Sequence, residues 1–574
     1  METFKLPIDY LETQFIHRLP DVVINDLELV DASATSPMYN VLLKPSHVFA
    51  KNMIHKWKKS YSSDVEFIEQ TQQVLKNTLS KEEEVVDADC LNEIWKDLYE
   101  TPNFHDRYNF IDVKQFHFVN QQSTFMGFWT IINLLSPAFS ILLPLILMVA
   151  PFVLLKIQGV PINFNTYLST LIDLAKKHTI GKALTSIGDF SFNNMIYLLF
   201  TVAMYGLQMY QNVKSCIRFY NNISSVNTNL LHVQRFVNRS ISNMEEYLRK
   251  NSNLSKYKEF CEDVSIHMGH LVSLREELKD VKPFSFGVSK CFEVGYLLKC
   301  YYCLHSVKEY KMGFEYAMAF EGYHDNLQSL ASNIHSETIH FGKVGREGKT
   351  RFVRQVYPAL ADSKPIENNI SLENNLIISG PNASGKTTQL KTTAINIIFT
   401  QQFGVGFYKT CNLVPYTHIH SYLNIPDTSG RDSLFQAEAR RCKEILDIID
   451  EDTPSKHFCI FDELFSGTNA EEATAASYGF LKYLQKHENV DFILTTHFMK
   501  LCKKVKNSKH LRIENYKMDA ELIGDNISFS YKLVKGISKI KAARLILLQM
   551  GFPKEIYERE LVVPFKSHTK ERLQ

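Results

Sequence analysis

One eight-residue segment has the residue types and the spacing of a phosphate-binding loop. It follows the apolar segment 376–379, precedes a helical pattern that begins at Thr388, and reads Gly380-Pro381-Asn382-Ala383-Ser384-Gly385-Lys386-Thr387. The two glycines permit a tight turn in which successive N–H groups point toward phosphate oxygens. Lys386 supplies a positive charge for the β- and γ-phosphates, and the Thr387 hydroxyl can bind Mg²⁺. Because the loop lies between a strand and a helix, the pattern predicts nucleotide binding by residues 380–388.

Two further apolar segments end in polar residues that nucleotide hydrolysis could use. Residues 457–461 lead into Asp462 and Glu463, and residues 492–496 lead into His497. We expect Asp462 to hold Mg²⁺ and Glu463 to orient and polarise the attacking water. His497 is expected to hydrogen-bond a γ-phosphate or that water. Strand ends with solvated acids are common by themselves, but the phosphate-binding loop earlier in the chain favours a catalytic role, with Lys386, Glu463 and His497 as catalytic residues.

Together these motifs resemble the ATPase domain of MutS proteins, which belongs to the ABC-type ATPases. The resemblance covers residues 350–560 and rests on Ser379-Gly380-Pro381-Asn382, on Asp462-Glu463-Leu464-Phe465-Ser466-Gly467-Thr468-Asn469 and on Thr495-Thr496-His497. It implies that ATP and Mg²⁺ are the cofactors. The segment Gly430–Glu438 stands where the family carries its serine-containing signature, which implies that Ser433 completes the ATP site of a partner subunit. Residues 531–538 and 550–553 are similar to the family's dimer-forming segment, so a homodimer is expected.

The regions before the ATPase-like domain follow the family less closely. Residues 211–340 have a helical pattern and resemble the family's lever region, which here ends at residues 356–360. Mismatch-reading members carry a glycine-led motif whose Phe wedges into DNA, and Phe67, Phe260 and Phe461, each followed two residues later by Glu, lack that context. Where the family often stacks an aromatic ring on adenine, this chain has Pro365-Ile366. Mismatch reading is therefore not predicted, and the preferred base stays open.

Two stretches are unusually poor in charge. No Asp, Glu, Lys or Arg occurs from Gln115 to Leu155 or from Phe190 to Val213. A membrane span needs about 20 mostly apolar residues, so a transmembrane hairpin of Thr124–Leu155 and Phe190–Val213 is predicted. Its orientation is open, because Lys and Arg residues are balanced on the two sides of the hairpin. The alternative is a pair of buried core helices.

Composition excludes several classes of protein. The chain has 574 residues, of which 45% are hydrophobic and 22% charged, which rules out wholesale disorder and a multi-span channel. Its 64 Lys and Arg residues nearly balance its 62 Asp and Glu residues, so it is not a polycation. The ten cysteines are scattered, and the pair Cys300 and Cys303 is read as inert thiols in a helix. The N-terminus lacks the pattern of a secretory signal.

The predicted fold class is an α/β P-loop (ABC-type) ATPase domain preceded by a helical lever region and a transmembrane helical hairpin. Its expected parts are an N-terminal region (1–123), the hairpin (124–213), the lever-like region (214–350) and the ATPase domain with its dimerisation segment (351–574). We expect a dimeric, membrane-anchored MutS-like ATPase on the cytosolic side, with double-stranded DNA as a further partner. The alternatives are a soluble intracellular or nuclear mismatch-repair ATPase and a nucleotide-switched structural protein without DNA binding. A transporter is disfavoured because two spans are too few.

Overall fold

A computed structural model of the chain describes residues 3–31, 36–78, 87–159, 163–175, 192–283, 291–363, 365–423, 425, 433–452, 455–508, 510–523, 526–540, 547, 550–553 and 556. The chain folds as two compact units. The first combines residues 1–85, 244–265 and 318–574, and the second combines residues 86–243 and 266–317. The predicted signature residues Gly430–Asp432 lie outside the described residues.

The first unit is built on a mostly parallel sheet. Its strands are β10 (His418–Tyr422), β11 (His457–Asp462), β12 (Val490–Thr496), β7 (Asn375–Ser379), β13 (Ile513–Ile523) and β14 (Asn526–Lys535), in that spatial order, and only the β13–β14 pair is antiparallel. The three central strands β11, β12 and β7 are almost continuously buried, as parallel strands covered on both faces are. This arrangement confirms the α/β fold expected of the C-terminal domain.

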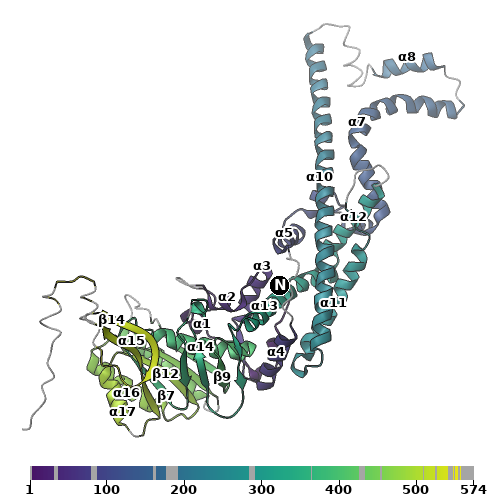
Figure 1. The fold of residues 1–574 in the computed structure, drawn as a ribbon. Helices are drawn as coiled ribbons and strands as arrows, with labels where there is room; N and C mark the ends of the chain where they lie inside the picture. The colour runs from purple at the N-terminus through teal and green to yellow at the C-terminus, as the bar shows by residue number, and fades with distance from the viewer. Residues whose placement is uncertain are drawn as a thin grey trace, which may run out of the picture. The chain divides into compact units, whose positions relative to one another are not determined.

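Helices and smaller sheets complete the first unit (Figure 1). The helices after the phosphate loop are α14 (Lys386–Phe403), α15 (Leu434–Glu451), α16 (Ala470–Leu484) and α17 (Met499–Asn507). A second sheet has the order β4 (Lys343–Val344), β9 (Thr410–Leu413), β5 (Arg351–Gln355) and β6 (Asn368–Ser371), and β3 (His340–Phe341) pairs with β8 (Val405–Gly406). The short 3₁₀ helices η5 (Ser255–Tyr257) and η7 (Pro358–Leu360) also belong to this unit.

The N-terminal residues pack on the ATPase-like fold instead of forming a unit of their own. Their elements are η1 (Pro7–Tyr10), η2 (Thr13–Phe15), β1 (Ile16–Arg18), α1 (Asp21–Asp26), α2 (Met38–Leu43), α3 (Val48–Trp57), β2 (Ser60–Ser62) and α4 (Val65–Asn77). The buried Gln402 side chain of α14 accepts a hydrogen bond from the Tyr39 hydroxyl at 2.9 Å and donates to the Trp57 carbonyl at 2.8 Å. Lys391 of α14 forms an ion pair with Glu28 at 2.9 Å. The helix that follows the phosphate loop is thus held by residues from the start of the chain.

The second unit is helical. It contains α5 (Ala88–Tyr99), α6 (Phe104–Tyr108), the 3₁₀ helix η3 (Lys114–Gln121), α7 (Ser123–Ile157), α8 (Phe164–Ala175) and α12 (Cys291–Ser306). Three long helices contribute to both units, namely α10 (Phe192–Asn251), α11 (Lys258–Leu278) and α13 (Lys308–His335). Apolar residues at helical spacing, including Leu230, Val233 and Val237, are fully buried, as the sequence pattern indicates.

The predicted membrane hairpin is wrong. The described residues of these stretches form much of α7 and the start of α10, and they expose large apolar side chains such as Phe139 and Leu199. Among the described residues, however, no helix is both long and apolar enough to cross a membrane. The predicted membrane localisation and membrane partner are overturned with it.

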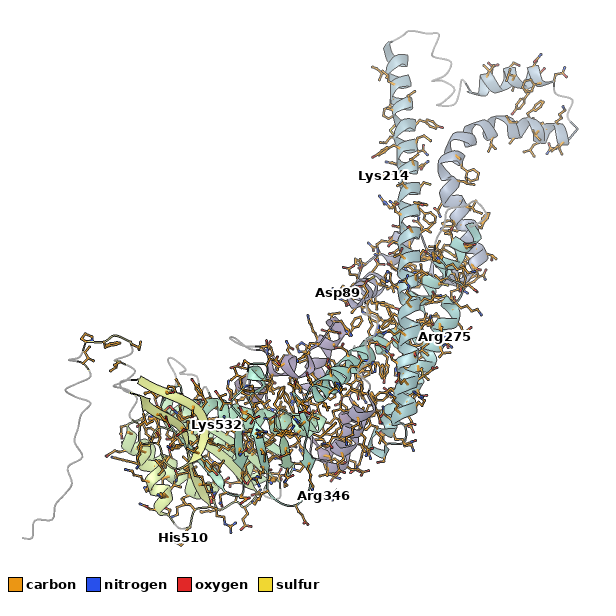
Figure 2. The ribbon with its side chains drawn as sticks, viewed as in Figure 1. Asp89, Lys214, Arg275, Arg346, His510 and Lys532 are labelled. Atoms are coloured by element: carbon orange, nitrogen blue, oxygen red, sulfur yellow. The ribbon has the colours of Figure 1, made fainter. Side chains whose placement is uncertain are left out.

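The start of the first stretch is covered by protein. The first turns of α7 lie directly against α12, since a Cβ added to Gly295 would lie 2.3 Å from the backbone nitrogen of Gly127. Met126 and Thr130 on this part of α7 are fully buried. The uncharged stretch of α10 is part of one continuous helix, which runs on past Lys214 (Figure 2).

Candidate functional site

The predicted site residues come from neighbouring parallel strands. Asp462 of β11 is in register with Thr495 of β12, and Thr496 of β12 is in register with Ser379 of β7. The carboxyl ends of parallel strands meet at one edge of a sheet, which is where ligands bind in such folds. The sheet therefore brings the phosphate loop, the two carboxylates and His497 to the same edge.

The backbone of the phosphate loop has the path that its two glycines predict. Gly385 adopts a φ of 91° immediately before α14, a conformation that L side chains rarely adopt. At Gly380, an added Cβ would lie 2.8 Å from the Ser384 hydroxyl oxygen. That hydroxyl donates to the Pro381 carbonyl at 2.8 Å and closes the loop on itself. Because α14 begins at Lys386, the positive end of its helix dipole faces the loop, which favours an anion there.

Lys386 is buried at the base of the loop, with 6% of its surface exposed. Its Nζ donates to the carbonyl oxygens of Gly380 at 3.0 Å and Pro381 at 3.2 Å, and it lies 3.5 Å from Glu463 Oε1. An ammonium group has three donors, and these neighbours keep it within the loop. A phosphate in the loop would exchange some of these contacts for stronger, charge-assisted hydrogen bonds to the same ammonium group.

Thr387 and Asp462 form a small oxygen-rich group beside the lysine. The Thr387 hydroxyl donates to Asp462 Oδ2 at 2.8 Å, and the Thr495 hydroxyl donates to Asp462 Oδ1. Mg²⁺ prefers hard oxygen ligands and commonly takes one or two protein carboxylates together with phosphate oxygens. The donor set fits Mg²⁺, and Thr495 holds the carboxylate in place.

Glu463 has the strained backbone and the charged neighbours of a functional residue. Its φ is 55°, in the left-handed region, and its N–H donates to the Thr495 carbonyl at 3.1 Å. Its Oε1 lies 3.3 Å from Nδ1 of His497, whose side chain is 45% exposed. The hydrogen bond from His497 lowers the pKa of Glu463 despite partial burial, and Lys386 acts in the same direction. Glu463 is therefore held as a carboxylate, the form that can polarise a water molecule.

These residues line a cavity of about 640 Å³, which is large enough for a small-molecule ligand. Residues 382–389, Asp462 and Glu463 form one side of it. The remaining lining is mostly apolar and comes from distant elements: Tyr357, Leu360, Pro365, Ile366, Met518 and Tyr531. Burial raises the pKa of Tyr357 to about 12, so its hydroxyl stays neutral. Sequence reasoning noted Pro365 and Ile366 but did not single out Tyr357, Met518 or Tyr531 as site residues.

Ser433 and His497 do not line this cavity. His497 reaches it only through Glu463, whereas Ser433 is exposed at the N-terminus of α15. The Ser433 hydroxyl accepts a hydrogen bond from the Gln436 N–H at 3.3 Å, and the Ser433 N–H donates to Gln436 Oε1 at 2.9 Å. Within one chain, Ser433 is thus a helix cap and is not brought together with the phosphate loop.

Glu438 is a further site residue that sequence reasoning did not assign. It lies on α15 with 2% of its surface exposed, and it accepts hydrogen bonds from Ser466 and Gly467, three and four residues after Glu463. In the sequence, Glu438 is visible only as a carboxylate at the end of the signature segment, and the fold is needed to show which groups that carboxylate contacts. Glu438 connects α15, the helix capped by Ser433, with the segment that follows β11.

Comparison with known proteins agrees with this geometry. Residues 376–561 match the family model for MutS domain V. The DNA mismatch repair protein MutS of Prochlorococcus marinus (strain AS9601) is 29% identical over 226 residues, which are 37% of this chain and 23% of that protein. MutS protein homolog 4 of Mus musculus is 29% identical over 195 residues, covering 32% of this chain and 19% of the homolog. DNA mismatch repair protein MutS of Bacteroides fragilis (strain YCH46) is 25% identical over 221 residues, covering 37% of this chain and 25% of that protein.

The matched segment thus spans about a quarter of the curated relatives or less. These comparisons give no support for a separate membrane-anchored branch. The matched segment includes β7, α14, β11 and β12, which carry or flank the phosphate loop, Asp462 and Glu463. Residues 376–561 of this chain are thus similar to domain V of MutS proteins.

Proposed function

We propose that the C-terminal domain binds ATP with Mg²⁺ and hydrolyses it. The observation that carries the proposal is the convergence of Lys386, Thr387, Asp462 and Glu463 on one cavity. A phosphate-binding loop alone supports binding only. A fixed carboxylate for the metal and a second, ionised carboxylate beside the lysine are the additional groups that hydrolysis requires.

In this proposal each group has a separate task. The loop N–H groups and Lys386 bind the β- and γ-phosphates, and Thr387 and Asp462 hold Mg²⁺, which neutralises charge that develops on the phosphate oxygens. Glu463 orients a water molecule toward the γ-phosphate and accepts its proton. His497 is a positioning residue that acts through Glu463, because its ring lies 3.3 Å from that carboxylate.

The apolar side of the cavity accommodates the base. Tyr357, Ile366 and Tyr531 line the cavity together with the phosphate loop. Aromatic and aliphatic surfaces bind a purine through stacking and burial, which does not by itself distinguish adenine from guanine. ATP is proposed over GTP on the family resemblance.

A homodimer with shared ATP sites is also proposed. Ser433 is exposed and lies outside the cavity of its own chain, as expected of a residue that completes the site of a second copy. Its position at the N-terminus of α15 adds a helix dipole that favours a γ-phosphate. ATP binding between two copies would draw the subunits together.

The biological role follows the relatives, which are named as DNA mismatch repair proteins. We propose that ATP binding and hydrolysis control contact with double-stranded DNA without the mismatch-reading wedge. The competing role is a nucleotide-switched structural protein that does not bind DNA. ATPase measurements with and without duplex DNA separate these roles, because only the first predicts a rate that depends on DNA.

The direct test of hydrolysis is Glu463→Gln. The variant should bind ATP with unchanged affinity and hydrolyse it at least about a hundredfold more slowly, the scale of a general-base contribution. Glu471→Gln is a suitable control, because Glu471 is exposed and its only described ion pair is with Lys500 on the surface. An unchanged turnover rate in Glu463→Gln would remove Glu463 from the mechanism.

A further inference from the structure

A second group of metal-ligating side chains lies in the helical unit. Three such side chains come together over twelve positions of the chain: His105 on α6, Asp112 in the segment between α6 and η3, and His117 on η3. Asp112 Oδ1 lies 3.6 Å from Nδ1 of His105 and 3.7 Å from Nε2 of His117. The two imidazole rings stack with centroids 5.3 Å apart and an angle of 17° between their planes. Two imidazoles thus face one carboxylate oxygen.

The distances fit a shared cation better than direct hydrogen bonds. Hydrogen bonds between these atoms would be about 2.7–3.2 Å long, so 3.6 and 3.7 Å are too long. Ligands about 2.0–2.1 Å from a tetrahedral Zn²⁺ ion are separated from one another by about 3.3–3.4 Å, from the geometry of the tetrahedron. The observed separations are within a few tenths of an ångström of that value, and all three ligand atoms lie within 4.8 Å of one another.

The protein holds this arrangement in place. The fully buried Asn120 side chain accepts a hydrogen bond from the Ile111 N–H at 3.1 Å and donates to the Ile111 carbonyl at 2.9 Å. This pair of bonds folds the segment back and places Asp112 beside His117. Nε2 of His117 is buried and has no hydrogen-bond partner among the described residues. A buried imidazole nitrogen without a partner is costly, and a metal ion would satisfy it.

We propose that His105, Asp112 and His117 bind a divalent transition-metal ion of the Zn²⁺ type. Two imidazole nitrogens and one carboxylate are a ligand set that suits Zn²⁺ and leaves a fourth position for water or another ligand. Asp112 is 70% exposed, so an ion can reach the site from solvent. The bound ion cross-links α6 to η3.

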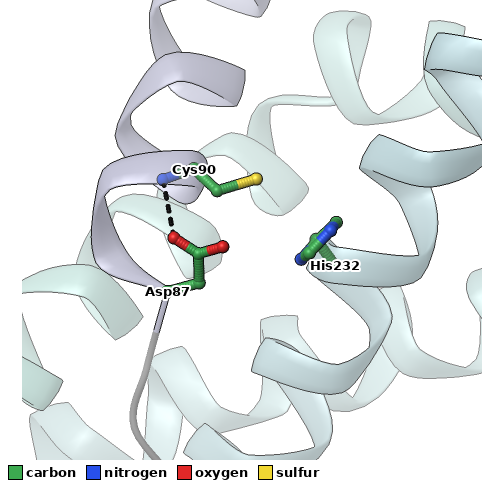
Figure 3. A group of neighbouring side chains, drawn as sticks. All are labelled: Asp87, Cys90 and His232. Atoms are coloured by element: carbon green, nitrogen blue, oxygen red, sulfur yellow. Dashed lines mark hydrogen bonds between the residues drawn. The ribbon is translucent and has the colours of Figure 1, made fainter.

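The described residues contain one other candidate group of this kind, which serves as an internal comparison. Asp87, Cys90 and His232 also place ligand atoms within 4.8 Å of one another (Figure 3). There the Asp87 carboxylate caps α5 by accepting a hydrogen bond from the Cys90 N–H at 3.2 Å. Burial and the nearby Asp87 raise the pKa of the Cys90 thiol, which disfavours the thiolate that a metal requires. A sulfur ligand distinguishes this group from the proposed site.

The test is zinc binding by the purified full chain. The chain is stripped with chelator and dialysed against Zn²⁺ in excess Mg²⁺, which occupies the oxygen ligands of the phosphate site, and retained zinc is measured by mass spectrometry. We expect one zinc ion per chain in the wild type and in Cys90→Ser. In Asp112→Asn and His117→Gln the affinity should fall by at least about tenfold, the lower end of the loss caused by removing even a supporting group.

Two further measurements make the result decisive. X-ray absorption should show only nitrogen and oxygen neighbours around the zinc, and at equal Zn²⁺ concentration the melting temperature should rise less in Asp112→Asn than in the wild type. Asp112 is exposed, so its variant should keep the wild-type circular dichroism spectrum without metal. The proposal is overturned if no stoichiometric zinc is retained, if Cys90→Ser loses it, or if sulfur appears among the neighbours.

Discussion

Glu438 and Ser466 connect two segments of the C-terminal domain that lie 28 positions apart in the chain. Oε1 of Glu438 accepts hydrogen bonds from both the N–H and the hydroxyl of Ser466, at 3.1 and 2.8 Å, and Oε2 accepts one from the Gly467 N–H at 3.1 Å. Because the carboxylate is buried, each bond is formed in a medium of low dielectric constant. These bonds connect α15, which Ser433 caps, to the segment that follows Glu463.

Glu438→Gln tests this connection. Glutamine keeps the shape but presents an NH₂ group toward one of the donors, so at least one buried hydrogen bond is lost. We expect the free energy of unfolding of the C-terminal domain to fall by about 2 kcal/mol, the scale of a hydrogen bond to a charged group. Hydrolysis should fall by about tenfold, which corresponds to about 1.4 kcal/mol in the barrier, while ATP affinity is retained. Glu444→Gln on the exposed face of α15 is the control, and equal effects in both variants would contradict the proposed role.

Ser433 allows the shared ATP site to be tested by mixing chains. Lys386→Ala and Ser433→Ala should each be inactive alone. Their mixture should recover activity, because one of the two sites in a heterodimer keeps both residues. Ser433→Asp separates this role from helix capping, since aspartate is also a good N-cap but repels a phosphate. It should be as stable as the wild type and inactive, whereas full activity in Ser433→Asp would exclude contact with the nucleotide.

The contact between His497 and Glu463 predicts a pH effect. The lowered pKa of Glu463 means that its carboxylate form persists below the usual titration range of glutamate, so activity should be retained at mildly acidic pH. His497→Ala removes the largest cause of that lowering, and partial burial then raises the pKa. The acidic limb of the pH–rate profile should move to higher pH. His487→Ala, which removes an ion pair with Asp450 away from the site, should leave the profile unchanged, and an unshifted limb in His497→Ala would reject the positioning role.

Sequence determined the parts of the site that depend on consecutive residues. The phosphate loop and the acids at the end of β11 were predictable because their chemistry lies in the order of neighbouring residues. Tyr357, Met518 and Tyr531 were not predictable as site residues, since they are distant in the chain from the phosphate loop and reach the cavity only in the folded structure. The same reason applies to Glu438, whose partners lie on another segment.

The hairpin prediction failed because absence of charge describes composition and does not identify what covers a helix. The close approach of Gly127 to Gly295 places the start of α7 against protein, and no local pattern in 124–155 encodes that partner. The same limitation applies to the N-terminal region, whose role the sequence does not predict. Its side chains contact α14 through single hydrogen bonds that only the folded structure reveals.

The bond between Tyr39 and Gln402 provides a test of that contact. Tyr39 is fully buried, and its hydroxyl donates to Gln402 Oε1 at 2.9 Å. Tyr39→Phe leaves this amide oxygen without its donor, which should lower the free energy of unfolding by about 1–2 kcal/mol. The matched control is Tyr483→Phe, because the Tyr483 hydroxyl also donates a side-chain hydrogen bond, in this case to the Asp450 carboxylate, but does so in solvent. Its cost should stay within about 0.5 kcal/mol, the usual range for surface substitutions.

Urea unfolding followed by Trp57 fluorescence, with Trp95 and Trp129 replaced by Phe, reports this region, because the Trp57 carbonyl accepts a hydrogen bond from Gln402. Equal midpoints for Tyr39→Phe and its parent would show that the N-terminal region contributes no stability through this bond.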